Sequence, residues 1–330
     1  MKLLHIGKKG NINRFSKKSE LMEGIEIIEM PSGLGADEYL AIGKDAEVII
    51  ADAMAKVSEE LIKGMPNLKM IHSEGVGYNF FDLEAAREKQ IYVCNCKGMN
   101  AMAVAEQTIL LMLSMLRNLR NCDQAVRNGH QIEKKEEYMK KGNLKELSDC
   151  KVGLIGFGDI AKCTAMILKS FNVETYYYSR AQGDKDVEEK YNVKYLELDE
   201  LLKNCNVFSI HLPVTNTTYE MVNDEFLSKI PEGSYLVNTA RGELVDSMAL
   251  VRALESGKLE MAALDTIAGE PVQLSNVLLN QEQKIMEKII FSPHIGGITA
   301  SSFKRGYSMI WSNIKKVIAG EKPDRIVNSL

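Results

Sequence analysis

Three segments late in the sequence each place a chemically active residue after an apolar run. Arg241 follows "SYLVNTA", Glu270 follows "MAALDTIAG" and His294 follows "IIFSP". Histidine titrates near neutrality and can exchange a proton, a neighbouring carboxylate stabilises the imidazolium, and arginine holds an anion and polarises a carbonyl. Ligands of open α/β sheets bind outside the carboxyl ends of the strands. We therefore expect these three residues to converge on one crevice.

Each of the three residues also has a purely structural interpretation. His294 could be a turn residue, Glu270 a solvated loop residue, and Arg241 could pair with Asp246. The remaining histidines are interpreted as packing residues (His72, His211) or match no motif (His5, His130).

A glycine-rich turn follows the apolar strand in "KVGLIGFGDIAK". Residues 156–161 read G-x-G-x-x-A, the dinucleotide fingerprint, and helical spacing follows in "AKCTAMILKSF". The first glycine permits a tight turn, the second lets the backbone approach a pyrophosphate, and the helix N-terminus favours anions. The turn is therefore predicted to bind a dinucleotide through Gly156, Phe157, Gly158, Asp159 and Ile160.

The end of the next strand, "VETYYYSR", indicates which dinucleotide binds. A site for NAD places an acidic residue there, whereas this sequence has Ser179 and Arg180, and Glu174 lies too early. A guanidinium can hold a 2′-phosphate through charge-assisted hydrogen bonds. We predict a preference for NADP over NAD, with NAD possible. The alternative is that Arg180 is a solvated loop residue.

Alternating strand and helix patterns must position these residues. A first series runs from "KLLHIG" to "IYVCNC", and residues 101–129 follow with the pattern of one long helix. A second series begins at Lys151, and the amphipathic "TASSFKRGYSMIWSNIKKVIAG" closes the chain. The charged run "EKKEEYMKKGNLKEL" is interpreted as a solvated helix or loop. Such alternation predicts the α/β class, with two Rossmann-like lobes that are each a mostly parallel sheet flanked by helices.

Composition and charge exclude several kinds of protein. The 330 residues carry a formal net charge of −4 without a long basic run, which argues against binding to nucleic acid. No window reaches the roughly 18 apolar residues of a membrane-spanning helix, and the N-terminus lacks the apolar core of a signal peptide. We therefore expect a cytoplasmic protein without a membrane partner. Cys94 and Cys96 are interpreted as buried strand thiols rather than metal ligands.

Six segments in this order resemble the D-isomer-specific 2-hydroxyacid dehydrogenase family. They are "GVGYNFFDLEAAREKQIYVCN" (75–95), "GMNAMAVAEQTILLMLSMLRNL" (98–119), "HLPVTNTT" (211–218), "NTARGELVD" (238–246), "DTIAGEP" (265–271) and "SPHIGG" (292–297). The resemblance implies reversible reduction of a small 2-keto acid to a D-2-hydroxy acid by hydride transfer from a nicotinamide coenzyme. A nucleotide-sensing, corepressor-like binding protein of the same fold is the alternative.

The resemblance also implies roles for individual residues. His294 matches the general acid/base, Glu270 its carboxylate partner and Arg241 the cation that orients the substrate. The backbone at Val76 and Gly77 matches the loop that receives the substrate carboxylate. The remaining matches surround the pyrophosphate (Gly156, Gly158, Asp159, Ile160) or line the adenosine and nicotinamide sides (Leu212, Pro213, Thr239, Ala240, Asp265).

The same resemblance implies the domain organisation. Residues 1–97 with 298–330 are expected to form a discontinuous substrate (catalytic) domain, and residues 98–297 the dinucleotide-binding domain, with the cofactor cleft between them. A homodimer through the cofactor lobes is expected. Glu270 argues against formate as substrate, because formate-oxidising members carry a neutral amide there. Met99, Met102 and Phe80 could line an apolar side-chain pocket or fill the core, so the particular 2-keto acid stays open.

Overall fold

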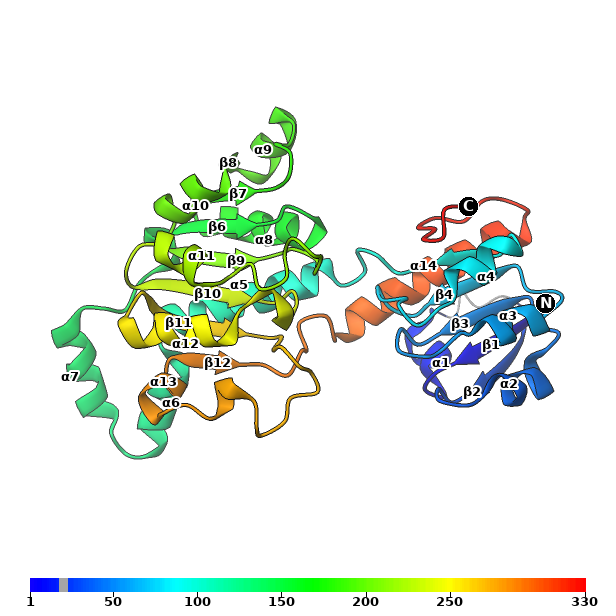
Figure 1. The fold of residues 1–330 in the computed structure, drawn as a ribbon, viewed down its shortest axis with the longest axis horizontal. Helices are drawn as coiled ribbons and strands as arrows, with labels where there is room; N and C mark the ends of the chain where they lie inside the picture. The colour runs from blue at the N-terminus through cyan, green and yellow to red at the C-terminus, as the bar shows by residue number, and fades with distance from the viewer. Residues whose placement is uncertain (18–22) are drawn as a thin grey trace. The chain divides into compact units, whose positions relative to one another are not determined.

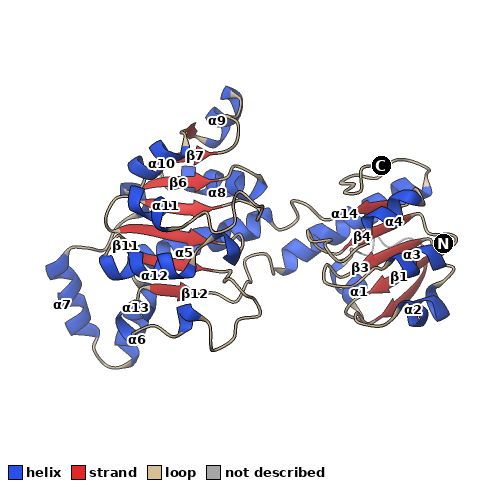
Figure 2. Cartoon of the chain, viewed as in Figure 1, coloured by secondary structure: helices blue, strands red, loops and turns tan. Residues whose placement is uncertain are grey.

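The short β-rich runs of the sequence form two separate parallel sheets (Figure 1). The computed structural model describes residues 1–17 and 23–330. These residues divide into two compact units: unit 1 comprises Met1–Asn100 with Ile298–Leu330, and unit 2 comprises Ala101–Gly297. Helices flank the strands of both units in Figure 2, which confirms the predicted α/β class.

In the described part of unit 1, five strands pair in the order β2-β1-β3-β4-β5, all parallel. The strands are β1 (Lys2–Ile6), β2 (Glu26–Met30), β3 (Val48–Ala51), β4 (Met70–Ser73) and β5 (Tyr92–Cys94). The helices are α1 (Asn11–Phe15), α2 (Ala36–Gly43), α3 (Glu59–Gly64), α4 (Leu83–Glu88) and α14 (Ala300–Ile318).

Side chains of unit 1 alternate between two cores, one on each face of its sheet. Leu4 and Ile6 of β1 pack with α2, α3 and α4, whereas Leu3 packs with α1 and α14. Trp311 of α14 is fully buried in this second core. Because α14 follows unit 2 in the sequence, the fold of unit 1 depends on both ends of the chain.

Cys94, Cys96 and Met99 also lie in the second core of unit 1. Burial raises the pKa of both thiols to about 12, in keeping with their interpretation as buried strand thiols. Met99 is only 5% exposed, so it fills the core rather than lining an open pocket.

In unit 2, seven strands pair in the order β12-β11-β10-β9-β6-β7-β8, again all parallel. The strands are β6 (Lys151–Ile155), β7 (Glu174–Tyr178), β8 (Val193–Tyr195), β9 (Val207–Ile210), β10 (Ser234–Asn238), β11 (Leu259–Leu264) and β12 (Ile289–Phe291). The order reverses at β6, which lies between β7 and β9, and such a switch point opens a crevice at the carboxyl ends of the strands.

Helices cover both faces of this second sheet. The helices of unit 2 are α5 (Ala101–Leu116), α6 (Leu119–Arg127), α7 (Gln131–Lys141), α8 (Asp159–Ser170), α9 (Lys185–Tyr191), α10 (Leu198–Asn204), α11 (Asp224–Lys229), α12 (Ser247–Ser256) and α13 (Gln283–Met286), with the 3-10 turns η1 (Leu147–Asp149), η2 (Gly242–Leu244) and η3 (Val277–Leu279). One core packs α5 and α8 against the sheet, and the other packs α10, α11 and α12.

The long helix expected over residues 101–129 is wrong: α5 ends at Leu116 and α6 begins at Leu119. Asn118 interrupts it in the left-handed conformation, with φ 44°, which asparagine tolerates better than most residues. Its side-chain amide donates to Tyr138 Oη of α7 at 2.6 Å. The break therefore turns α6 toward α7, and the exposed, charged α7 agrees with the predicted solvated helix.

Two histidines interpreted as packing residues are neutral. His72 is fully buried, donates from Nδ1 to Ser73 O at 2.8 Å, and faces the Asn313 amide through Nε2 at 3.1 Å. Burial lowers its pKa to about 4. His211 bonds Ser209 at 2.9 Å, and desolvation likewise lowers its pKa to about 4. Neither ring is charged at neutral pH.

Candidate active site

His294 and Glu270 form a hydrogen-bonded pair at the carboxyl edge of the unit 2 sheet. His294 follows β12, and its Nδ1 lies 2.6 Å from Glu270 Oε2. The other oxygen, Oε1, accepts a hydrogen bond from Ile267 N at 2.9 Å, which fixes the carboxylate. Both side chains are partly exposed, at 47% and 35%. No bond to His294 Nε2 is found in the described part of the chain, so this atom can exchange a proton with a ligand.

The buried carboxylate of Asp265 holds the backbone of the turn that contains His294. Asp265 Oδ1 accepts from Ser292 Oγ at 2.5 Å and Ile295 N at 3.1 Å, and Oδ2 accepts from Gly296 N at 2.8 Å. His294 itself has φ 55°, a left-handed conformation that a non-glycine residue keeps only where its surroundings impose it. Asp265, predicted to line the coenzyme site, holds this turn.

Arg241 is exposed on the turn that follows β10. Its carbonyl accepts from the Asn238 side chain at 2.7 Å, and its Nη1 donates to Ala240 O at 2.7 Å. It does not pair with Asp246 as the structural alternative suggested, because that carboxylate caps α12 through the N–H groups of Met248 and Ala249. Among the described residues, no carboxylate neutralises the Arg241 guanidinium.

A close backbone approach joins the Arg241 turn to the Glu270 loop. A Cβ placed on Gly242 would lie 2.0 Å from Ile267 C and 2.1 Å from Ala268 N, so only glycine fits there. The N–H of Ile267 is the group that holds Glu270. The Arg241 turn, Glu270 and His294 are thus linked through successive contacts at the ends of β10, β11 and β12.

An apolar cavity of about 420 Å³ borders the His294–Glu270 pair. The side chains that line it include Ile267, Val272 and Phe291. Low-polarity walls strengthen electrostatic interactions between charged groups beside them. The pair therefore lies between an apolar wall and solvent.

The glycine turn after β6 has the geometry that the fingerprint predicts. Gly156 has φ 99°, and its N–H donates to Tyr178 O at 2.8 Å. A Cβ on Gly156 would lie 2.5 Å from His211 O and 3.0 Å from Leu212 Cδ2. The Phe157 ring stacks on Tyr177 at 4.1 Å, which turns it toward the sheet. The turn is rigid and fits no residue larger than glycine at position 156.

The N-terminus of α8 can hold the phosphates of a dinucleotide. Gly158 is its N-cap and provides no side-chain cap, so the first N–H groups, at Asp159 and Ile160, have no capping partner. A Cβ on Gly158 would meet nothing within 4 Å, so open space lies beside this backbone. Unpaired N–H groups, a helix dipole and free space fit an anionic pyrophosphate.

Ser179 and Arg180 follow β7, next to the glycine turn. Ser179 Oγ donates to Ala181 O at 2.6 Å, whereas the exposed Arg180 side chain makes no bond or ion pair in the described part of the chain. Glu174, at the start of β7, is bound instead by Tyr176 and Lys151. A free guanidinium, and no carboxylate, therefore occupies the end of this strand.

The other residues predicted to line the coenzyme site follow β9 and β10. Leu212 lies beside Gly156, and Pro213 next to it is exposed. Thr239 is 6% exposed and its Oγ1 lies 2.9 Å from Thr108 Oγ1 of α5, and Ala240 follows it. All four positions are therefore at the same carboxyl edge as the glycine turn.

Val76 and Gly77 lie in unit 1, on the loop after β4. Each carbonyl of residues 75–77 accepts a hydrogen bond: Gly75 O from Cys96 N at 2.8 Å, Val76 O from Asn95 Nδ2 at 2.8 Å, and Gly77 O from Ser73 Oγ at 2.6 Å. In contrast, no bond to the N–H of Val76 or Gly77 is found among the described residues. These two donors are available to an anion.

Two supporting residues were not predicted from the sequence, although both lie within the matched motifs. Asn238 holds the Arg241 turn through both Arg241 O and Ala240 N, and Ser292 donates to Asp265. A polar residue at or just after the last position of a buried strand is the only sequence pattern that could have indicated them.

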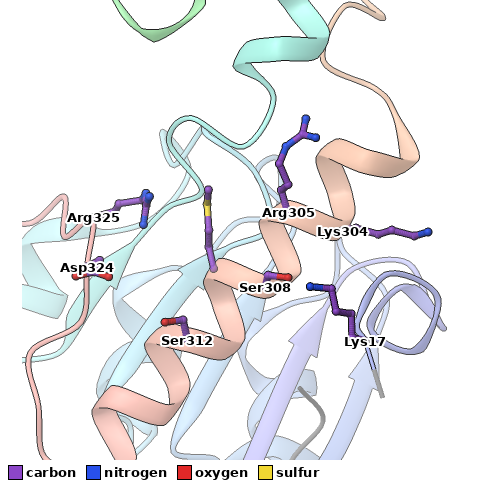
Figure 3. Close-up of a pocket in the computed structure, with 8 residues that line it drawn as sticks. Lys17, Lys304, Arg305, Ser308, Ser312, Asp324 and Arg325 are labelled. Atoms are coloured by element: carbon purple, nitrogen blue, oxygen red, sulfur yellow. The ribbon is translucent and has the colours of Figure 1, made fainter. Parts of the chain in front are cut away.

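A second cavity, of about 390 Å³, lies in unit 1 and contains none of the predicted site residues (Figure 3). Both arginines that line it are bound to backbone: Arg305 Nε donates to Met99 O at 2.7 Å, and Arg325 Nε donates to Lys97 O at 3.1 Å. These hydrogen bonds hold the segment after β5 in place. We therefore assign a structural role to both arginines and do not include this cavity in the candidate active site.

Comparison with known proteins identifies the family of this chain. The model of the family "D-isomer specific 2-hydroxyacid dehydrogenase, NAD binding domain" matches residues 109–296. The chain belongs to this family. It is similar to a glyoxylate reductase of Thermofilum pendens (34% identity over 88% of this chain and 84% of that one) and a hydroxypyruvate reductase of Thermotoga maritima (33%, over 87% and 90%).

Solved structures share the fold of this D-2-hydroxyacid dehydrogenase family member over almost its entire length. D-mandelate dehydrogenase of Rhodotorula graminis superposes with a TM-score of 0.83 at 24% identity, covering 99% of this chain and 97% of that one. The NAD-complexed D-isomer specific 2-hydroxyacid dehydrogenase of Lactobacillus delbrueckii gives 0.85 at 22% identity, covering 99% and 100%.

Membership confirms the predicted reaction class: the protein is a nicotinamide-dependent oxidoreductase of 2-keto and 2-hydroxy acids. The nucleotide-sensing binding protein is not favoured. Among the described residues, none of the helices combines the length and apolar character that crossing a membrane requires.

The two glycines of the dinucleotide turn give separable predictions. Gly156→Ala should lower the stability of the free protein by roughly 1–2 kcal/mol, because φ 99° is strained for alanine and its methyl would meet His211 O. Gly158→Ala should keep the melting temperature but weaken dinucleotide binding about tenfold or more, since its methyl would occupy the open space beside α8. Differential scanning fluorimetry and calorimetric titration measure both. Wild-type affinity in Gly158→Ala would place the phosphates elsewhere.

Proposed function

We propose that the protein reduces a small 2-keto acid to a D-2-hydroxy acid, with His294 as the acid/base and NADP(H) as the preferred coenzyme. The observation that carries this proposal is the 2.6 Å pair between His294 Nδ1 and the anchored carboxylate of Glu270, with Nε2 left unbonded. When bound, the coenzyme supplies the hydride to the carbonyl carbon.

The residues of the chain handle the proton and the charge. In the reducing direction, protonated His294 donates from Nε2 to the carbonyl oxygen, and in the reverse direction it accepts the hydroxyl proton. Glu270 stabilises the imidazolium through Nδ1 and keeps the ring oriented. Reduction of a ketone requires one hydride at carbon and one proton at oxygen, so a single imidazole suffices for the proton. Formate oxidation has no such proton, so the Glu270 carboxylate argues against formate as the substrate.

The substrate carboxylate is proposed to be held by Arg241 and by the loop of Val76 and Gly77. The support is that Arg241 has no carboxylate partner and that the two loop N–H groups are unbonded while the adjacent carbonyls are fixed. A guanidinium can bind a carboxylate and polarise the neighbouring carbonyl at the same time.

The preference for NADP(H) rests on Arg180 at the end of β7. Its guanidinium is exposed and unpaired within the described residues, and Ser179 presents a hydroxyl where a carboxylate would repel a 2′-phosphate. The other proposed coenzyme contacts are those described above for the glycine turn, Leu212, Pro213, Thr239, Ala240 and Asp265. A cytoplasmic location stays a prediction from the sequence.

The proposed chemistry is tested by His294→Gln with a panel of 2-keto acids and both coenzymes. The wild type should oxidise NADPH with at least one of them, and the variant should lose on the order of 10²-fold in rate, the usual contribution of a positioned acid/base. Calorimetric titration should show unchanged coenzyme affinity. A rate loss below about threefold would remove His294 from the mechanism, and tight coenzyme binding by a wild type inactive on every acid would favour a binding protein.

Coenzyme preference is tested by Arg180→Ala. The KM for NADPH should rise about tenfold or more, because a charged hydrogen bond to the 2′-phosphate is lost, and the KM for NADH should stay within about twofold. Lys185→Ala, a change of another cation after β7, is the matched control. Equal use of the two coenzymes by the wild type would reject the preference.

We further propose that the protein is a homodimer assembled through the dinucleotide-binding unit. Exposed apolar side chains on α6 and α7 support this: Val126 is 56% exposed, Ile132 58% and Met139 75%. A cavity of about 550 Å³ with partly apolar walls lies between the two helices. Exposed apolar area of this kind marks interaction surfaces.

The dimer is tested by light scattering of Val126→Asp/Met139→Asp after gel filtration. The wild type should have twice the mass of the chain and the variant should shift toward the monomer, because burying two carboxylates is costly. Ile42→Asp, at a residue of unit 1 that is 60% exposed, should leave the mass unchanged. A monomeric wild type at micromolar concentration contradicts the proposal.

A further inference from the structure

A buried polar cluster in unit 1 lies outside every motif of the sequence. Glu74, only 7% exposed, follows β4, and its Oε1 lies 2.8 Å from Nε2 of His5 in β1. The hydroxyl of Tyr307, from α14, donates to the same oxygen. On the other side of the fully buried imidazole, Nδ1 lies 3.3 Å from Glu29 Oε1. Three elements distant in sequence thus meet at one carboxylate.

This carboxylate stands directly before the loop proposed to receive the substrate. The N–H of Glu74 donates to Ala51 O at 2.8 Å, and Gly75 N donates to Ser73 Oγ at 3.1 Å. With the carbonyls of the loop also bonded, Glu74 is the side chain that ties the start of the loop to β1 and α14. A shift of its backbone would move the N–H groups of Val76 and Gly77.

The charges in the cluster require compensation. A buried carboxylate beside an anion-binding loop repels the anion and is itself costly to desolvate. His5 has a carboxylate oxygen near each ring nitrogen, although Nδ1 makes no hydrogen bond among the described residues. A neutral ring can turn an N–H toward only one of the two carboxylates, so we infer that His5 is the cation that compensates them. The fully buried phenol of Tyr307 has a raised pKa, by burial and then by Glu74, so it remains a neutral donor.

We propose that Glu74 is a positioning residue for the substrate: His5 and Tyr307 hold it so that it fixes the Gly75–Gly77 loop, and the charge of His5 offsets that of Glu74 beside the substrate carboxylate. The inference rests on the proposed function of that loop. No contact between Glu74 and the substrate is implied. The cluster acts through the placement and the electrostatics of the two loop N–H groups.

Four variants separate positioning from charge. Glu74→Ala removes both bonds and should raise the KM for the keto acid about tenfold, with kcat within about threefold. Glu74→Gln keeps an acceptor oxygen and should raise it much less. His5→Gln leaves the Glu74 charge uncompensated and should raise this KM several-fold, and adding Glu74→Gln should restore it toward the wild type. Glu59→Ala, which removes an exposed carboxylate of α3, should leave this KM unchanged.

Two further measurements fix the interpretation. Coenzyme affinity should not change in any variant, because the coenzyme residues lie in unit 2 and the cluster lies in unit 1. Amide hydrogen exchange of a peptide covering residues 73–81 should be several-fold faster in Glu74→Ala than in Glu74→Gln.

The possible failures are distinguishable. An unchanged KM in Glu74→Ala overturns the positioning role, and an His5→Gln defect that Glu74→Gln does not relieve overturns the charge role. If the wild type reduces no keto acid, the proposed function fails. Hydrogen exchange then decides the inference alone, and equal exchange in the two Glu74 variants overturns it.

Discussion

The bond between His294 Nδ1 and Glu270 Oε2 depends on the backbone conformation of two turns. Each turn is fixed by buried polar groups: Asp265 binds the backbone after β12, and Ile267 N binds the Glu270 carboxylate. Gly242 then brings the Arg241 turn against the same backbone. Exposed side chains of this kind lose entropy when ordered, so the supporting hydrogen bonds are what make a 2.6 Å contact persist at the surface.

The parallel sheets, and the edge at which the site lies, were predictable because strand and helix periodicities alternate and parallel strands end on one side. The break at Asn118 was not predictable, because the apolar stripe continues across it and the cause is a tertiary bond to Tyr138. The edge strand β8 (Val193–Tyr195) was not predicted either, because the exposed Lys194 at its centre interrupts any apolar run.

The residues of the site can also be divided into those that the sequence predicts and those that it does not. The glycine turn could be predicted from a short stretch of sequence. The residue with positive φ, the residue that lets the backbone approach a ligand and the helix N-terminus all lie within six consecutive positions. Cys94 and Met99 illustrate the opposite limit. From the sequence Cys94 could be a core residue or a metal ligand, and Met99 a core residue or part of a pocket wall, and only the packing decides. His5 matched no motif because its partner Glu74 lies 69 residues away, and Tyr307, which binds the same carboxylate oxygen, lies 233 residues from Glu74. Pairing over such separations leaves no mark in one sequence.

The contacts proposed for the anionic substrate are of two electrostatic kinds. Those proposed for unit 2 are the proton of His294 and the full positive charge of Arg241, whose range in solvent is limited by screening. The unit 1 loop contributes backbone N–H groups, whose partial charges are fixed in direction and cannot be neutralised by a passing carboxylate. Donors of this kind act only if the loop cannot relax away from the anion. The cluster proposed at Glu74 meets that requirement, because movement of the loop would break the bonds that His5 and Tyr307 make to its buried carboxylate.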